Sequence, residues 1–82
     1  MVIKHDLGDW IVAALQANEG SARLVEICRF VWDHHEDELR RSGDLFFTWQ
    51  YDIRWAATNL RHAGVLKAAR LSPTGVWELT RA

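Results

Sequence analysis

The sequence has few of the residues that interrupt or cross-link a chain. It contains one proline and one cysteine in 82 residues, so no disulfide can form within the chain. Cys28 stands among apolar neighbours, and no cationic cluster that would activate it can be read beside it. We therefore expect a buried thiol in a reduced, cytoplasmic setting. Linkers, repeats and low-complexity segments are absent too, and residues 1–82 are predicted to form a single domain.

Long apolar runs are also absent. None approaches the roughly 20 residues that span a bilayer, and Asp6 and Asp9 interrupt the region where a signal peptide would be apolar. We expect a soluble protein of the cytoplasm without a membrane partner. Tryptophan, by contrast, is abundant, with five residues. Each indole buries a large area, which helps to compensate for the small core of so short a chain.

The net charge of −1 is small, but the charges are unevenly distributed. Residues 1–37 hold three basic and seven acidic side chains, a net charge of −4. Residues 38–82 hold seven basic side chains, Arg81 among them, and four acidic ones, a net charge of +3. Such an asymmetry favours a charged partner for the C-terminal half.

Apolar residues at spacings of three and four predict helices in the N-terminal half. The first helix is expected at about residues 7–17 and ends before Gly20. The second is expected at about residues 21–33, with Ser21 as its N-cap. The polar run at residues 34–41 follows as a solvated helical turn or a second short helix.

A third helix is predicted at about residues 48–63. Thr48 is the expected N-cap, and Gly64 is the expected stop. One stripe of this helix is apolar and is expected to face the core: Trp49, Ile53, Ala56, Leu60 and Ala63.

After Gly64 the period of the pattern changes to two. Residues 65–71 and 76–80 are predicted to be strands that are joined by a turn containing Pro73, with Trp77 and Leu79 facing inward. The predicted fold is mainly α with a small β-hairpin wing. It is a winged helix-turn-helix, in which three or four helices precede a two-stranded antiparallel wing.

A second face of the third helix carries hydrogen-bonding side chains. Arg and Gln on a helix can pair with base edges in the major groove of DNA, and cations on a following wing can contact phosphates. A solvated helix face carries the same residue types, so this face also fits a role in solubility alone. The candidate DNA contacts are Gln50, Arg54, Thr58 and Arg61 on the helix and Lys67 and Arg70 on the wing, with Arg40 and Arg41 as further phosphate contacts.

Residues 51–80 resemble a known family. The elements that carry the resemblance are Trp55-Ala56, Leu60, Ala63-Gly64-Val65-Leu66 and Gly75-Val76-Trp77 followed by Leu79-Thr80. They are similar to the motif of the winged-helix module at the N-terminus of Mrr-type restriction endonucleases. The resemblance implies a winged-helix fold and DNA binding, with the helix that contains Arg54 as recognition helix.

Two positions depart from this family pattern. Asp52 and Thr74 stand where the family often has basic residues, which lowers the positive charge on the expected DNA side. The nuclease domain that accompanies the module has no counterpart in 82 residues. We therefore expect no enzyme, but the targeting part of such a system or a free-standing regulator of transcription.

The polar run is dense in side chains of the metal-ligand type, and His34 and Glu38 have the i, i+4 spacing that places two ligands on one helix face. No third ligand is evident, and no nucleophile–base motif or phosphate-binding glycine loop appears. We expect no catalytic residue, metal or cofactor.

The leading hypothesis is a non-catalytic protein that binds double-stranded DNA. The alternative is a winged-helix module for a protein partner or a homodimer, without direct DNA contact. Exposed aromatic anchors would favour the alternative, with Trp10, Trp32 and Phe47 as candidates. Phe46 and Phe47 are expected in the core, and Trp49, Trp55 and Trp77 in the core or packed at its flank.

Overall fold

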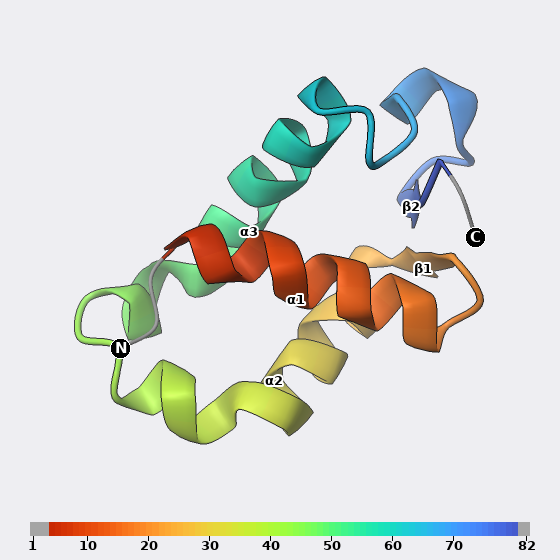
Figure 1. Ribbon diagram of the computed structural model, residues 1–82. Coiled ribbons are helices and arrows are strands. Elements are labelled where there is room, and N and C mark those ends of the chain that lie inside the picture. Colours follow the sequence, from red (N-terminus) through yellow and green to blue (C-terminus); the bar gives the residue numbers. More distant parts are fainter. Residues whose placement is uncertain (1–3, 81–82) are drawn as a thin grey trace.

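The computed structural model describes residues 4–80, so Arg81 lies outside the described residues. Within these residues the chain is mainly helical and has one antiparallel pair of strands. The prediction of a mainly α chain with a small antiparallel β element is therefore confirmed. The elements are α1 (Lys4–Ala17), β1 (Ser21–Arg23), α2 (Leu24–Arg40), α3 (Leu45–His62), the short 3₁₀ helix η1 (Ala69–Leu71) and β2 (Val76–Glu78) (Figure 1).

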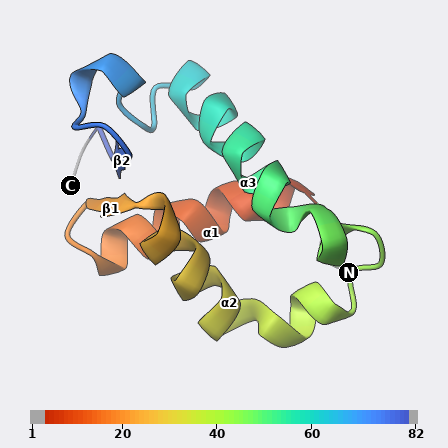
Figure 2. The ribbon, with the colours of Figure 1, turned by 180° about the vertical axis from the view of Figure 1, so that it is seen from behind.

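Helix α1 lies between the other two helices. α2 and α3 meet at residues 41–44 and diverge from there, and α1 packs against both (Figures 1 and 2). Leu7, Ile11 and Leu15 recur every four residues on α1, and all three are fully buried. They meet buried residues of α2, α3, β1 and the bridge between residues 66 and 79, which include Ala22, Ile27, Val31, Leu39, Leu45, Trp49, Ile53, Leu66 and Leu79.

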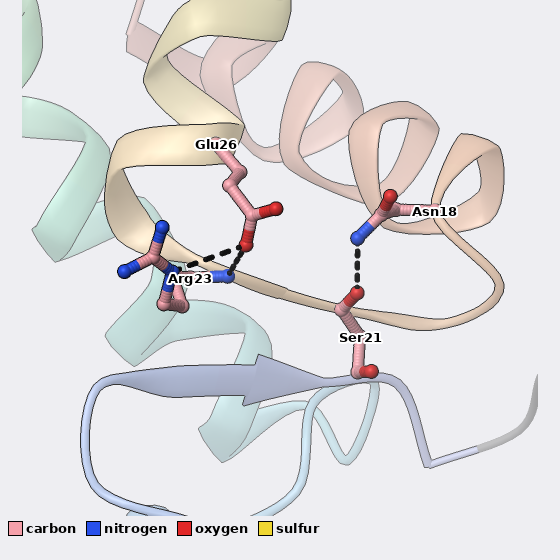
Figure 3. A network of polar contacts seen from close by, with 4 residues as sticks. All are labelled: Asn18, Ser21, Arg23 and Glu26. Carbon is pink, nitrogen blue, oxygen red and sulfur yellow. Dashed lines mark hydrogen bonds and ion pairs between the residues drawn. The ribbon is translucent and has the colours of Figure 1, made fainter.

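The segment that follows α1 is a strand, so the prediction of a helix from Ser21 is wrong. Backbone groups of β1 pair antiparallel with β2, with Ala22 opposite Trp77. The Asn18 side chain donates a hydrogen bond to the Ser21 carbonyl at 2.7 Å (Figure 3). The pairing of β1 with β2 joins segments more than 50 residues apart in the sequence. A local sequence pattern cannot predict a contact over such a distance.

Helix α2 begins at Leu24 and is capped by a carboxylate. The Arg23 backbone N–H donates to Glu26 Oε1 at 2.8 Å, and this hydrogen bond lowers the pKa of the Glu26 carboxyl below its usual value (Figure 3). The helix runs to Arg40 and thus includes the polar run up to that residue, with a kink at His35 (φ −131°, ψ 20°). Leu39, at the end of that run, is fully buried.

The predicted strand at residues 65–71 is wrong over most of its length. Only Leu66 pairs, in an antiparallel bridge with Leu79, and the Lys67 N–H donates to the Glu78 carbonyl at 2.9 Å. β2 therefore lies between β1 and residues 65–67. The chain then leaves the sheet and forms η1, in which Ala, Arg and Leu have helical rather than β propensity.

Helix α3 starts earlier than predicted and ends as predicted. It begins at Leu45, so Thr48 is no N-cap, while Gly64 has a φ of 79° just after the helix. Trp49 and Ile53 are buried as expected, Ala56 and Leu60 are half-buried, and Ala63 is exposed. The buried face also includes Asp52 and Ala57.

Among residues 4–80, no helix combines the length and the apolar character that a membrane span requires.

We predict that two leucines respond differently to the same truncation. Leu39→Ala removes a fully buried side chain and should lower the free energy of unfolding by about 2–5 kcal/mol. Leu71→Ala, at a position that is 63% exposed, should change it by less than about 0.5 kcal/mol. Urea denaturation followed by circular dichroism measures both. Equal losses would show that the kinked end of α2 does not pack as described.

Candidate nucleic-acid interface

The predicted DNA-contact residues of α3 lie on one side of the helix, away from α1. Gln50 and Arg54 are exposed, whereas Thr58 and Arg61 are half-buried. The Thr58 hydroxyl donates to the Arg54 carbonyl at 3.1 Å, a common arrangement for threonine inside a helix. Gln50 and Arg54 are therefore the two side chains of this set that project furthest into solvent.

Arg61 is held against the sheet. Its guanidinium carbon lies 5.6 Å from the centroid of a Trp77 ring, within the range of a cation–π interaction. The Nε atom is buried and has no hydrogen-bond partner among residues 4–80. Arg61 thus joins the end of α3 to β2, and a contact with DNA would compete with this packing.

Lys67 and Arg70 belong to the loop between α3 and β2, which lies beside the C-terminal end of α3 in both views (Figures 1 and 2). Lys67 Nζ is 3.8 Å from Glu78 Oε2, so part of its charge is balanced. Arg70 is exposed on η1. The structure therefore brings these cations next to the C-terminal half of α3.

Arg40 and Arg41 lie at the opposite end of α3. Eighteen helical residues, roughly 27 Å, separate that end from the loop. The Arg40 Nε–H donates to Glu36 Oε2 at 2.8 Å, and its guanidinium lies 5.1 Å from the Trp32 centroid. These two arginines are not grouped with Lys67 and Arg70.

Asp52 does not share the exposed face with Arg54. Its side chain is buried on the side that faces α1, and Oδ2 accepts a hydrogen bond from the Thr48 hydroxyl at 2.6 Å. The negative charge that departs from the family pattern is thus turned away from the predicted DNA contacts. Thr74 is exposed in the loop.

Sequence reasoning missed a row of exposed aromatic side chains on α3. Phe47 is 83% exposed, although it was expected in the core, and Trp55 is 56% exposed. Tyr51 stands between them at 63% exposure and contacts Trp55 edge-on, with ring centroids 6.4 Å apart. Part of the signal is in the sequence, because residues 51 and 55 lie opposite the apolar stripe of the predicted helix. Residue 47 joins them because α3 begins at Leu45 rather than at residue 48.

Among residues 4–80, hollows lie on two sides of α3. The first, of about 500 Å³, lies between α1 and α3 and includes Asp9, Asp52, Trp55 and Asn59 in its lining. The second, of about 480 Å³, lies between α2 and α3; we call it the α2–α3 groove, and Val25, Cys28, Arg29, Trp32, Phe46, Trp49 and Gln50 line it. The first hollow contains carboxylates and the second a guanidinium, so their electrostatic characters are opposite.

Trp10 and Trp32, the candidate partner anchors, and Phe46, an expected core residue, are all packed against other side chains. Trp10 is 9% exposed and stacks on His35 with centroids 3.8 Å apart. Trp32 is half-buried and stacks on Trp49, and Phe46 is half-buried beside it. Trp32 and Phe46 therefore form a wall of the α2–α3 groove.

The histidines of the polar run are used within α2. The His34 ring donates to the Phe30 carbonyl at 2.9 Å, and the His35 ring pairs with Glu38 Oε1 at 2.7 Å. His34 and Glu38, the pair with the spacing of metal ligands, are thus engaged with different partners. The described part of the chain holds no cluster of three or more His, Cys, Asp or Glu side chains arranged for a metal ion.

Cys28 is half-buried in the α2–α3 groove. Burial raises the pKa of its thiol above the usual value near 9.0, and the nearby Arg54 guanidinium offsets part of that rise. The thiolate is the reactive form, so burial makes Cys28 less reactive. This electrostatic effect requires Arg54 of α3 to lie within Coulombic range of Cys28 of α2.

No protein-family model, curated protein or solved structure matches the chain.

We predict that Arg54→Ala slows the alkylation of Cys28 by iodoacetamide. The variant loses the positive charge that stabilises the thiolate, so the pKa rises further and the pH–rate profile shifts upward. The matched control is Arg70→Ala, which removes an exposed arginine from η1 and should leave the profile in place. An unshifted profile for Arg54→Ala would contradict the proximity of the two side chains.

Proposed function

We propose that the chain is a non-catalytic, winged-helix DNA-binding module. The order of elements supports the winged-helix assignment, because β1 falls between α1 and α2 and pairs with β2, while residues 65–67 flank the other edge of β2. The loop between Lys67 and β2 then corresponds to the wing. The resemblance of residues 51–80 to the N-terminal module of Mrr-type endonucleases points the same way.

The observation that carries the DNA proposal is the pairing of an exposed polar helix face with an adjacent cationic loop. Gln50 and Arg54 have the donors and acceptors that read base edges in a major groove. Lys67 and Arg70 follow at the C-terminal end of α3, where phosphates would lie. In this proposal the exposed residues of α3 contact the base edges, and the loop contacts the phosphate backbone of the DNA.

The burial of Asp52 strengthens this proposal. A carboxylate on the outer face of α3 would repel phosphates, but Asp52 is 6% exposed and bonded to Thr48. The number of cations at the interface is still small. Binding by a single copy should therefore be modest and should weaken steeply with salt.

A protein partner is the second candidate function, and the exposed aromatic row on α3 favours it. Phe47, Tyr51 and Trp55 are large exposed aromatic side chains, and tyrosine and tryptophan are enriched at interface hot spots. A partner helix could lie along this row. Fluorescence anisotropy with labelled duplex DNA separates the two functions, because a protein-docking module gives no binding even at low salt.

We predict different consequences for two matched arginine variants. Arg54→Ala should cost about 1–3 kcal/mol on a preferred duplex and much less on random DNA, because it removes a base contact. Arg70→Ala should weaken binding to both duplexes about equally, because it removes a phosphate contact. It should also lower the slope of log affinity against log salt concentration by about one. Anisotropy titrations at two salt concentrations measure both effects. Equal losses on the two duplexes for Arg54→Ala would remove it from the base-reading role.

A further inference from the structure

The α2–α3 groove has walls suited to a flat, unsaturated ring. Trp32 has two aromatic neighbours, and its centroid is 6.2 Å from that of Trp49 and 6.4 Å from that of Phe46. The groove volume of about 480 Å³ is in the range of small-molecule sites. Aromatic walls of this kind bind planar groups through stacking and dispersion contacts.

The polar groups at the edge of the groove select the charge of its occupant. Arg29 and Gln50 are exposed, and both belong to the lining. No carboxylate lines this groove within residues 4–80, and Arg54 lies near its Cys28 wall. The hollow between α1 and α3 instead contains Asp9 and Asp52. The α2–α3 groove thus favours an anion that carries an aromatic ring.

We propose that the α2–α3 groove binds a single nucleotide, with its base against the aromatic walls, its base edge at the Gln50 amide and its phosphate at Arg29. Each part of a nucleotide meets a suitable group. Aromatic side chains stack on bases of any identity, amides pair with base edges, and guanidinium groups bind phosphate through two parallel hydrogen bonds.

This inference rests on the proposed DNA-binding function and specifies its substrate further. Gln50 belongs both to the groove lining and to the polar face of α3, so a strand held along α3 brings its nucleotides to the groove edge. A paired base leaves the stack at a cost of about a few kcal/mol, and this cost is smaller for an unpaired base. DNA with an unpaired base is therefore the preferred substrate. A free nucleotide supplies the same chemistry.

Cys28 provides a reporter inside the groove. The full chain is treated with iodoacetamide alone, with thymidine 5′-monophosphate, with inorganic phosphate, with a flush duplex, and with the same duplex carrying one unpaired thymine. We expect the monophosphate and the bulged duplex to slow alkylation severalfold, and phosphate and the flush duplex to leave it unchanged. The bulged duplex should also bind about tenfold more tightly than the flush one, the value of one stacked base.

Substitutions at the groove edge test the assigned contacts. Arg29→Ala and Gln50→Ala should each weaken protection by the monophosphate, Arg29→Ala by at least about tenfold, because its charge-assisted hydrogen bonds to the phosphate are lost. Each rate is compared with and without nucleotide in the same variant, since the substitution itself can alter the thiol. Arg70→Ala is the control and should leave protection by the monophosphate intact. Arg29 and Gln50 are both exposed, so the two variants should fold like the parent chain, and circular dichroism verifies that they do.

The outcomes separate the two sources of nucleotide and the two proposals. Protection by the bulged duplex supports an unpaired nucleotide in DNA, and protection by the monophosphate alone supports a free nucleotide. Equal protection by phosphate and monophosphate overturns the base site, as does an unprotected Cys28 with every probe. If no probe protects Cys28 but the flush and bulged duplexes bind equally well, the proposed DNA-binding function still holds and only the nucleotide site is overturned. If neither duplex binds, the proposed DNA-binding function is overturned too.

Discussion

The burial of α1 between α2 and α3 is the constraint on which the rest of the structure depends. Leu7, Ile11 and Leu15 have no exposed surface, and together they fix which side of α3 faces inward. Asp52 and Ile53 of α3 are buried on that side, and Gln50 and Arg54 are left in solvent. The outer face of α3 is thus determined by the core. A chain of this length can bury only a small core, and placing one helix between two others lets the same apolar side chains stabilise both.

A second constraint, the pairing of β2, positions the cationic loop. β2 holds β1 on one edge and residues 65–67 on the other, which closes the chain between Lys67 and Val76 into a loop beside the end of α3. Arg61 reinforces this arrangement through its contact with Trp77. The loop with the proposed phosphate contacts therefore lies beside the C-terminal end of the helix that carries the proposed base contacts.

The helices were predictable from the sequence because their signal is local. Spacings of three and four located α1 and most of α2 and α3, and Gly64 marked the end of α3 through its positive φ. β1 was not predictable in this way, because Ser21–Arg23 becomes a strand only through a partner near the C-terminus. The polar face of α3 followed from a helical wheel, and its DNA role stays a prediction. The α2–α3 groove arises from the way two helices diverge, which no periodicity encodes.

The central claim is that the outer face of α3 and the following loop contact DNA. Amide chemical shifts of the isotope-labelled protein, recorded while duplex DNA is added at low salt, test it most directly. The claim predicts that the largest changes fall on Gln50–Arg61 and on Lys67–Arg70, and that added salt reverses them. Changes confined to the α1 side of the molecule, around Gly8 and Asp9, or no changes at all, would contradict it.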